Sequence, residues 1–149
     1  MNTIDKSELN DFFVETFNSI LAKEEKIFEN TLYNDLTIKE CHVIEAIEIL
    51  KKENNNTMTH IANKINISVG ALTTSIKAMI KKDYVKRITS TTDHRVIYIE
   101  ITEKGAKAID IHREFHDSII DCILKSHSKE ELINLKHCLT TFNNFFKKL

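Results

Sequence analysis

The sequence predicts a mostly α-helical fold with one small β-hairpin, and three observations favour this fold class. The 149 residues include no proline and two glycines, which suits helices with few sharp corners. Apolar residues recur every three or four positions through most of the chain, as on one face of a helix. Between residues 84 and 101 the spacing changes to alternation, which is typical of strands.

Two helices are predicted in the first third of the chain. The first covers residues 5–30, and its apolar side chains fall at helical spacing. They are Leu9, Phe12, Phe13, Phe17, Ile20 and Leu21. Thr37 and Glu40 form a capping box that opens a second helix to about Lys51, because their side chains satisfy the first free amides. The apolar stripe of this helix is Cys41, Ile44, Ile47 and Leu50.

A pair of helices with a tight turn between them is predicted next. One runs from Thr59 to Lys64, Asn66 makes the turn, and Ser68 caps a second helix to about Lys82. The predicted inward side chains are Ile61, Ala62, Ile65, Val69, Leu72, Ile76, Met79 and Ile80. The outward face of the second helix is small and rich in hydroxyl groups, and it comprises Gly70, Ala71, Thr73, Thr74 and Lys77. Such a face can approach base edges and phosphates, although an ordinary helical hairpin could also expose one.

The β-rich segment follows this pair of helices directly. A first run, residues 84–89, is joined by a polar link of hairpin length to a second run, in which Ile97, Ile99 and Ile101 should form one buried face. Arg95 stands near the tip of the hairpin. An arginine-tipped hairpin after a helix-turn-helix pattern predicts a winged helix-turn-helix that grips a DNA backbone or minor groove. The alternative is that Asp93 and Arg95 only staple the hairpin.

The last two predicted helices, together with the first, point to a dimer. One helix runs from Thr102 to about Lys125, and a capping box at Ser128 and Glu131 opens another that ends near Leu149. All eight phenylalanines lie outside residues 29–114. Four apolar side chains cluster at the C-terminus, and they are Phe142, Phe145, Phe146 and Leu149. So much apolar surface is unusual on a monomer, although these helices could also pack within one chain.

The distribution of charge supports a nucleic-acid partner. The formal net charge of −1 alone argues weakly against one. Residues 57–95, however, hold seven basic and two acidic side chains, a net charge of +5, whereas the rest holds fourteen and twenty, a net charge of −6. The positive field therefore coincides with the predicted DNA-binding segment, where it can neutralise phosphates.

Composition and motifs exclude several other classes. No apolar run approaches the roughly 18 residues that a membrane span needs, and no signal-peptide pattern opens the chain. The cysteines Cys41, Cys122 and Cys138 are odd in number and widely spaced, which indicates a reducing cytoplasm rather than a disulfide framework. Neither a Gly-rich phosphate loop nor a nucleophile elbow is present, so we expect no enzyme.

Several motifs resemble those of the MarR family of dimeric winged-helix regulators. They are Ile65 to Ser68, Tyr84-Val85 and, above all, Asp93-x-Arg95 followed by Thr102-x-x-Gly105. The resemblance implies a single domain over residues 1–149, with dimerisation helices at 1–30 and 103–149 and a winged helix-turn-helix lobe at 31–102. Asp83 and Asn66 stand where the family usually has glycine, and both residue types can adopt the left-handed conformation at a small cost.

The resemblance also implies a homodimer that binds double-stranded DNA with an inverted repeat. Arg95 would reach the minor groove or the backbone, oriented by Asp93 through a charge-assisted hydrogen bond. The helix that follows Ser68 would lie in the major groove. The full set of expected DNA-binding residues is Ser68, Gly70, Ala71, Thr73, Thr74, Lys77, Arg87, Asp93, His94 and Arg95.

Within that family the chain is most similar to the FabT subgroup, which represses bacterial fatty-acid synthesis genes. The similar segments are residues 38–42, 73–75 and 112–116. This implies a long acyl chain on acyl carrier protein as co-repressor, in an apolar cleft between the dimer helices and the winged lobe. Periodicity favours as lining residues Phe17, Leu21, Ile47, Ile111, Phe115 and Ile119. Each could equally be plain core, and no cofactor is expected to be required.

Two histidines favour a rival effector. His112 and His116 lie four residues apart, which places both imidazoles on one helical face at the spacing that zinc favours. His42 and Glu24 could complete a set of four ligands. This arrangement is similar to that of zinc-sensing MarR repressors of metal-uptake genes. The alternative is an exposed or hydrogen-bonded histidine pair without a metal.

Overall fold

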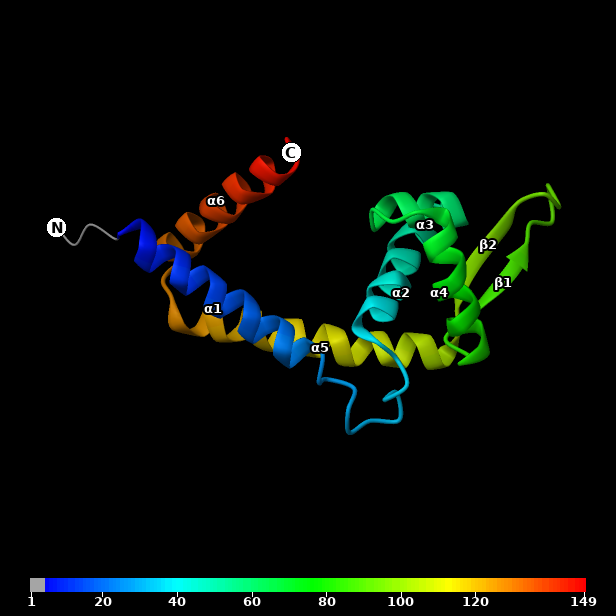
Figure 1. Ribbon diagram of the computed structural model, residues 1–149, viewed down its shortest axis with the longest axis horizontal. Helices are drawn as coiled ribbons and strands as arrows, with labels where there is room; N and C mark the ends of the chain where they lie inside the picture. The colour runs from blue at the N-terminus through cyan, green and yellow to red at the C-terminus, as the bar shows by residue number, and fades with distance from the viewer. Residues whose placement is uncertain (1–4) are drawn as a thin grey trace. The chain divides into compact units, whose positions relative to one another are not determined.

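Six α-helices and one two-stranded antiparallel sheet make up residues 5–149, the part of the chain that this computed structural model describes (Figure 1). In chain order the elements are α1 (Lys6–Glu24), α2 (Ile38–Lys51), α3 (Met58–Lys64), α4 (Val69–Lys81), β1 (Val85–Thr89), β2 (Ile97–Ile101), α5 (Glu103–Ser126) and α6 (Lys129–Phe146). The predicted fold class, helices with a single hairpin, is confirmed. None of the helices described here is long and apolar enough to cross a membrane.

The chain divides into two compact units, with the boundary between Arg113 and Glu114 inside α5. The first unit contains α1 to α4, the hairpin and the first part of α5, and the second contains the rest of α5 with α6. The finer division into dimerisation helices and a winged lobe stays a prediction.

The core of the first unit is built largely from α2, α3, α4 and the base of the hairpin. The predicted stripe of α2 is buried, and so are the central apolar residues of α4, namely Leu72, Ile76 and Met79. Val69 and Ile80 were predicted to face inward, and this is wrong because they are 44% and 37% exposed. At 3.6 residues per turn both lie roughly 60° away from the centre of the buried stripe, which places them at its edge.

The end of α1 differs from the sequence prediction. The helix stops at Glu24 rather than continuing to residue 30. Beyond it the amides bond three residues back instead of four, as in Lys26 N–H to the Lys23 carbonyl at 3.1 Å and Ile27 N–H to the Glu24 carbonyl at 3.3 Å. These tighter turns accompany the burial of Phe28, which is 3% exposed in the core. The segment has no glycine or proline to mark the end of the helix.

The hairpin pairs β1 with β2 in antiparallel register, with Val85 opposite Ile101 and Thr89 opposite Ile97. The predicted buried face of β2 holds only at the base. Ile99 is fully buried and Ile101 is half-buried, whereas Ile97 is 43% exposed because the outer part of the hairpin extends beyond the core. The buried side chain of Asn56 fastens the base by donating to the Ile99 carbonyl at 2.8 Å.

Three positions compared with the family's motifs, Asn66, Asp83 and Gly105, have the backbone surroundings that those motifs predict. Asn66 and Asp83 have φ angles of 56° and 65°, so both adopt the left-handed conformation expected at the two turns. Gly105 lies against the chain that precedes β1, where a Cβ atom would collide with the Tyr84 carbonyl oxygen. The Gly105 amide donates to the Thr102 hydroxyl at 3.1 Å. The Thr102-x-x-Gly105 motif therefore joins the start of α5 to the end of α4.

The second unit contains the predicted capping box, in which Ser128 accepts from the Glu131 amide and Glu131 accepts from Ser128. This confirms where α6 begins, and the helix ends at Phe146, close to the predicted end near Leu149. None of its residues is buried. The exposed apolar side chains from α6 to the C-terminus are Ile133, Leu135, Leu139, Phe142, Phe145, Phe146 and Leu149.

Candidate nucleic-acid interface and histidine cluster

Helix α4 presents the small, hydroxyl-rich face that its sequence predicted. Ser68 caps the helix by accepting from the Ala71 amide at 3.2 Å, and the outward residues are exposed except for Thr73, which is half-buried. The hydroxyls of Thr73 and Thr74 donate back to carbonyls of the preceding turn, at 2.7 and 3.4 Å. Their methyl groups and oxygen lone pairs remain available to a DNA groove, where such groups contact thymine methyls and base edges.

The tip of the hairpin holds its arginine in a defined orientation. Arg95 donates to Asp93 through Nε at 3.1 Å and Nη2 at 3.3 Å, and its backbone amide adds a third bond at 3.0 Å. The same hydrogen bonds hold the pKa of Asp93 below its ordinary value. The Arg95 side chain is nonetheless 91% exposed, so the guanidinium is oriented without being covered. His94 and Arg87 are also exposed on the hairpin.

The structure brings together three of the four residues considered as metal ligands. Glu24 from α1, His42 from α2 and His112 from α5 place their ligand atoms within 4.8 Å of one another. Glu24 Oε1 lies 2.7 Å from His112 Nε2 and 3.2 Å from His42 Nε2. His116 follows one turn further along α5, in the second unit, with its ring 5.3 Å from that of Phe115.

A fourth member of this cluster, Glu45, was missed by the sequence analysis. Its carboxylate lies 2.6 Å from Nδ1 of His112, so the buried imidazole stands between two carboxylates. Burial alone would lower the pKa of His112, but the hydrogen bonds to Glu45 and Glu24 raise it above its ordinary value. Burial would likewise raise the pKa of Glu24, but hydrogen bonds to His112 and His42 hold it below the ordinary value.

The donor set fits a zinc ion. Two imidazoles and a carboxylate are common zinc ligands, and a ligating histidine commonly gives its other ring nitrogen to a carboxylate, as His112 does to Glu45. Cys41 is buried nearby on α2, and desolvation raises the pKa of its thiol to about 12, with the carboxylates of Glu45 and Glu24 adding to the effect. Its thiol therefore stays protonated near neutral pH in the metal-free protein, and among the described residues it is not part of the cluster of ligand atoms.

The residues expected to line an effector pocket differ in burial, and they belong to both units of the chain. Ile47 is fully buried in the core of the first unit, so it can line a ligand site only if that core opens. Phe17 and Leu21 on α1 are 58% and 54% exposed. Ile111 is half-buried against the first unit's core, whereas Phe115 and Ile119 are half-buried in the second unit. Their role as an effector pocket stays a prediction.

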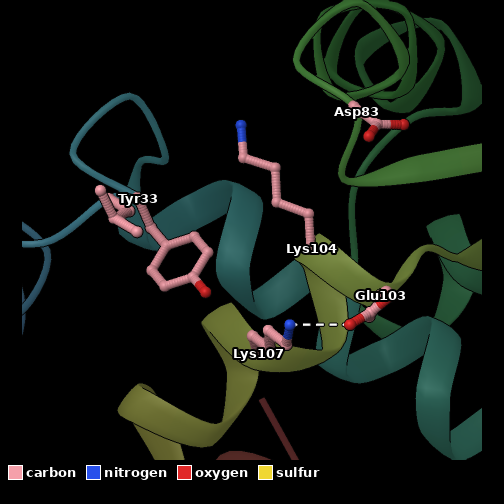
Figure 2. A pocket seen from close by; sticks show the side chains of 6 residues that line it. Tyr33, Asp83, Glu103, Lys104 and Lys107 are labelled. Atoms are coloured by element: carbon pink, nitrogen blue, oxygen red, sulfur yellow. Dashed lines mark ion pairs between the residues drawn. The ribbon is translucent and has the colours of Figure 1, made fainter.

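A pocket of about 430 Å³ lies within the first unit, and four of its six lining residues are charged (Figure 2). Its lining residues are Leu32, Tyr33, Asp83, Glu103, Lys104 and Lys107. Lys107 pairs with Glu103 at 2.7 Å, and Lys104 donates to the Lys82 carbonyl at 2.8 Å with its Nζ 4.2 Å from the centre of the Tyr84 ring. Glu103, Lys104 and Lys107 are thus engaged within the protein, and a lining with four charged residues does not suit an acyl chain.

A helix-turn-helix followed by an arginine-tipped wing is the fold of DNA-binding transcriptional regulators, and the chain has that architecture. The family model of the transcriptional regulators SarA/Rot matches residues 26–111. The chain belongs to this family, and it shares the fold of solved proteins that include a MarR family protein from Bacillus stearothermophilus.

Relatives in several bacteria support this assignment. The transcriptional regulator AdcR of Streptococcus pyogenes is 30% identical over 131 residues, which cover 84% of this chain and 88% of that protein. The regulator SarZ of Staphylococcus haemolyticus is 31% identical over 130 residues, covering 84% and 85%. The crystal structure of Streptococcus pneumoniae FabT in complex with DNA matches with a TM-score of 0.84 at 26% identity, covering 97% of this chain and 99% of that one. AdcR and SarZ are named transcriptional regulators, in agreement with the expectation that the chain is not an enzyme.

Proposed function

We propose that the chain acts as a homodimeric repressor that binds an inverted repeat in duplex DNA. The observation that carries the proposal is the Asp93–Arg95 pair, which holds an exposed guanidinium at the tip of the hairpin. The same unit presents the hydroxyl-rich face of α4, a helix that reads the major groove in winged-helix proteins. The ten expected DNA-binding residues, Ser68 to Arg95, belong to these two elements.

Exposed apolar side chains support the dimer. Phe12 and Phe17 on α1 are 64% and 58% exposed, and α6 has no buried residue although it is amphipathic. Surfaces of this kind mark interaction sites. A two-fold partner that covers them would also set the spacing of two α4 helices at about one turn of DNA.

Selection from a random duplex library tests the DNA-binding proposal directly. We expect the wild-type protein to enrich an inverted repeat and to lose affinity steeply as salt rises, because several phosphates are neutralised. Fluorescence anisotropy at several salt concentrations would measure both the affinity and its slope. Failure to enrich any duplex, or an affinity independent of salt, would refute the proposal.

The regulated genes in this proposal are those of fatty-acid synthesis, with long-chain acyl-(acyl carrier protein) as co-repressor. The similarity to FabT over nearly the full length supports this choice. The expected result is that acylated carrier protein tightens binding to the selected duplex while the unacylated carrier does not. Equal binding with both carriers would contradict the acyl response.

The histidine cluster favours a second candidate, a zinc-responsive repressor of metal-uptake genes. Its support is the convergence of Glu24, His42 and His112, with Glu45 behind the buried histidine. Bound zinc would raise the melting temperature, and His112→Ala should abolish that rise. His137→Ala on α6 is a matched control, because it removes an exposed imidazole that is outside the ligand cluster found among the described residues. Restoration of operator binding by zinc after chelation would favour this candidate over the acyl response.

A further inference from the structure

Lys82, the residue that ends the recognition helix α4, has different surroundings from most basic residues near it. Its ammonium group donates to the Asp35 carbonyl at 2.6 Å and to both carboxylate oxygens of Glu40 at 2.9 and 2.8 Å. An ammonium has three N–H groups, so all of its donors are used. The Lys82 side chain is 27% exposed and that of Glu40 is 10% exposed, so the pair is largely withdrawn from solvent.

Glu40 has a second structural task at the start of α2. Its Oε2 atom accepts from the Thr37 amide at 2.9 Å and from the Thr37 hydroxyl at 3.1 Å, which completes the capping box. One carboxylate therefore bonds both Thr37, the N-cap residue of α2, and Lys82, the residue that follows α4. Because α2 is the most buried helix of the first unit, this pair anchors the end of the recognition helix to the core.

Further hydrogen bonds hold the backbone just after α4. The Lys82 carbonyl accepts from Lys104 at 2.8 Å, and the Asp83 carbonyl accepts from the Thr102 hydroxyl at 2.6 Å. The Tyr84 hydroxyl donates to the Asp35 carboxylate. Three consecutive residues at the end of α4 are thus bonded to the segment before α2 or to the start of α5. No comparable set of bonds holds the N-terminus of α4 among the residues described, where Ser68 caps its own helix.

We propose that Lys82 and Glu40 are positioning residues, which orient α4 for DNA without touching it. The inference rests on the proposed function, in that α4 must be the helix that binds DNA. It assigns Lys82 a different role from that of the other basic residues in the 57–95 segment. The Lys82 ammonium forms an ion pair with Glu40 and does not contact a phosphate.

The Glu40→Gln variant tests the proposal, because positioning and electrostatics predict opposite changes in its affinity for DNA. Removal of a negative charge near a DNA-binding lobe should by itself tighten binding. Loss of the carboxylate charge, and of one of the two oxygens that accept from Lys82, should instead weaken it about 3- to 30-fold, the range expected for residues that couple to a site without contacting the ligand. Glutamine still completes a capping box, so the start of α2 is retained. Binding that is unchanged or tighter in this variant would overturn the proposal.

Lys82→Met supplies the second arm, measured by the salt dependence of binding to the selected duplex. Loss of a phosphate contact would lower the slope of log affinity against log salt by about 1, whereas loss of positioning weakens binding and leaves the slope unchanged. Lys81→Met is the matched control, because it removes the same charge from the neighbouring, exposed position. A slope reduced by about 1 in Lys82→Met, or equal losses of affinity in the two lysine variants, would refute positioning.

Circular dichroism and melting curves would confirm that each variant is folded. If Lys82→Met does not fold, Glu40→Gln alone decides the question, since its expected sign is opposite to that of a charge effect. Failure of the proposed function is recognised separately, because the wild-type protein would then select no duplex. Wild-type binding that Arg95→Ala weakens and Glu40→Gln does not would refute only the positioning role.

Discussion

The interior of the first unit and helix α6 of the second carry similar amphipathic patterns with opposite outcomes. Ile44, Ile76 and Ile99 come from three elements of the first unit, and each is 0% exposed. On α6 the apolar side chains have the same helical spacing, yet Phe145 and Phe146 are 57% and 66% exposed. The pattern alone marks a face that must be covered. Whether the cover comes from the same chain or from a partner depends on the tertiary arrangement.

The largest expected effect, on assembly and DNA binding, comes from removing exposed apolar residues at the C-terminus. Deletion of residues 139–149 removes the C-terminal apolar cluster, and we expect a monomer or an aggregate that no longer binds DNA. Sedimentation velocity would measure the assembly, and gel shift on the selected duplex would measure binding. The control is Lys147→Ala with Lys148→Ala, which alters the same end of the chain and leaves the phenylalanines in place. A truncated protein that remains a dimer would show that α6 is covered in another way.

A core substitution tests the buried pattern. Ile76→Ala should lower the free energy of unfolding by about 2–5 kcal/mol, because it removes a fully buried side chain and leaves a cavity. Ile80→Ala on the same helix is the matched control, and its cost should be less than half as large since Ile80 is 37% exposed. Urea denaturation at one protein concentration would compare them. Equal costs would contradict the assignment of Ile80 to the edge of the stripe.

A smaller effect is expected from the wing. Arg95→Ala should weaken DNA binding by about 1–3 kcal/mol if the guanidinium reads a base edge. Stability should hardly change, because an exposed ion pair contributes little. Arg113→Ala is a suitable control, since it removes an exposed arginine that pairs with Glu48 of α2 rather than with a residue of the hairpin. Unchanged DNA affinity for Arg95→Ala would mean that Asp93 and Arg95 only staple the hairpin.

The smallest expected effect concerns pH. Because the carboxylates raise the pKa of His112, its contribution to stability is fully present below the ordinary histidine pKa of about 6.5. That contribution is lost as the pH rises through the raised pKa of the folded state. Melting curves of metal-free protein should show this decline, and His112→Gln should reduce it. Zinc prefers the neutral imidazole, so added zinc should reverse the trend if the cluster binds it. Parallel curves for wild type and variant would contradict the ion-pair account.

Much of the fold could be predicted because local signals encode it. The capping boxes at Thr37 and Ser128 and the buried stripe of α2 lie where spacing predicted them. The end of α1 could not be predicted, since burial of Phe28 rather than a helix-breaking residue accompanies it. Ile97 was wrongly assigned to a buried face because alternation does not reveal how far a hairpin extends beyond the core.

Among the candidate site residues, those that depend on neighbours in sequence were predicted, and those that depend on contacts between distant segments were missed. The outward face of α4 and the Asp93–Arg95 pair depend on neighbours in sequence, so pattern and family resemblance found them. Glu45 and its bond to His112 were missed, because 67 residues separate the partners. The bond between Lys82 and Glu40 spans 42 residues and has no periodic signature. Only the folded arrangement shows that the Lys82 ammonium uses its hydrogen-bond donors within the protein.

The three cysteines offer a means of watching the second unit without altering the sequence. Cys41 is buried, and its thiol has a pKa of about 12, whereas Cys122 and Cys138 are exposed on α5 and α6. A maleimide reagent reacts with thiolates that it can reach, so it should modify the second pair and spare the first. A fluorophore attached in this way would report on α5 and α6 alone, and its rate of attachment would measure how much of those helices a partner chain shields.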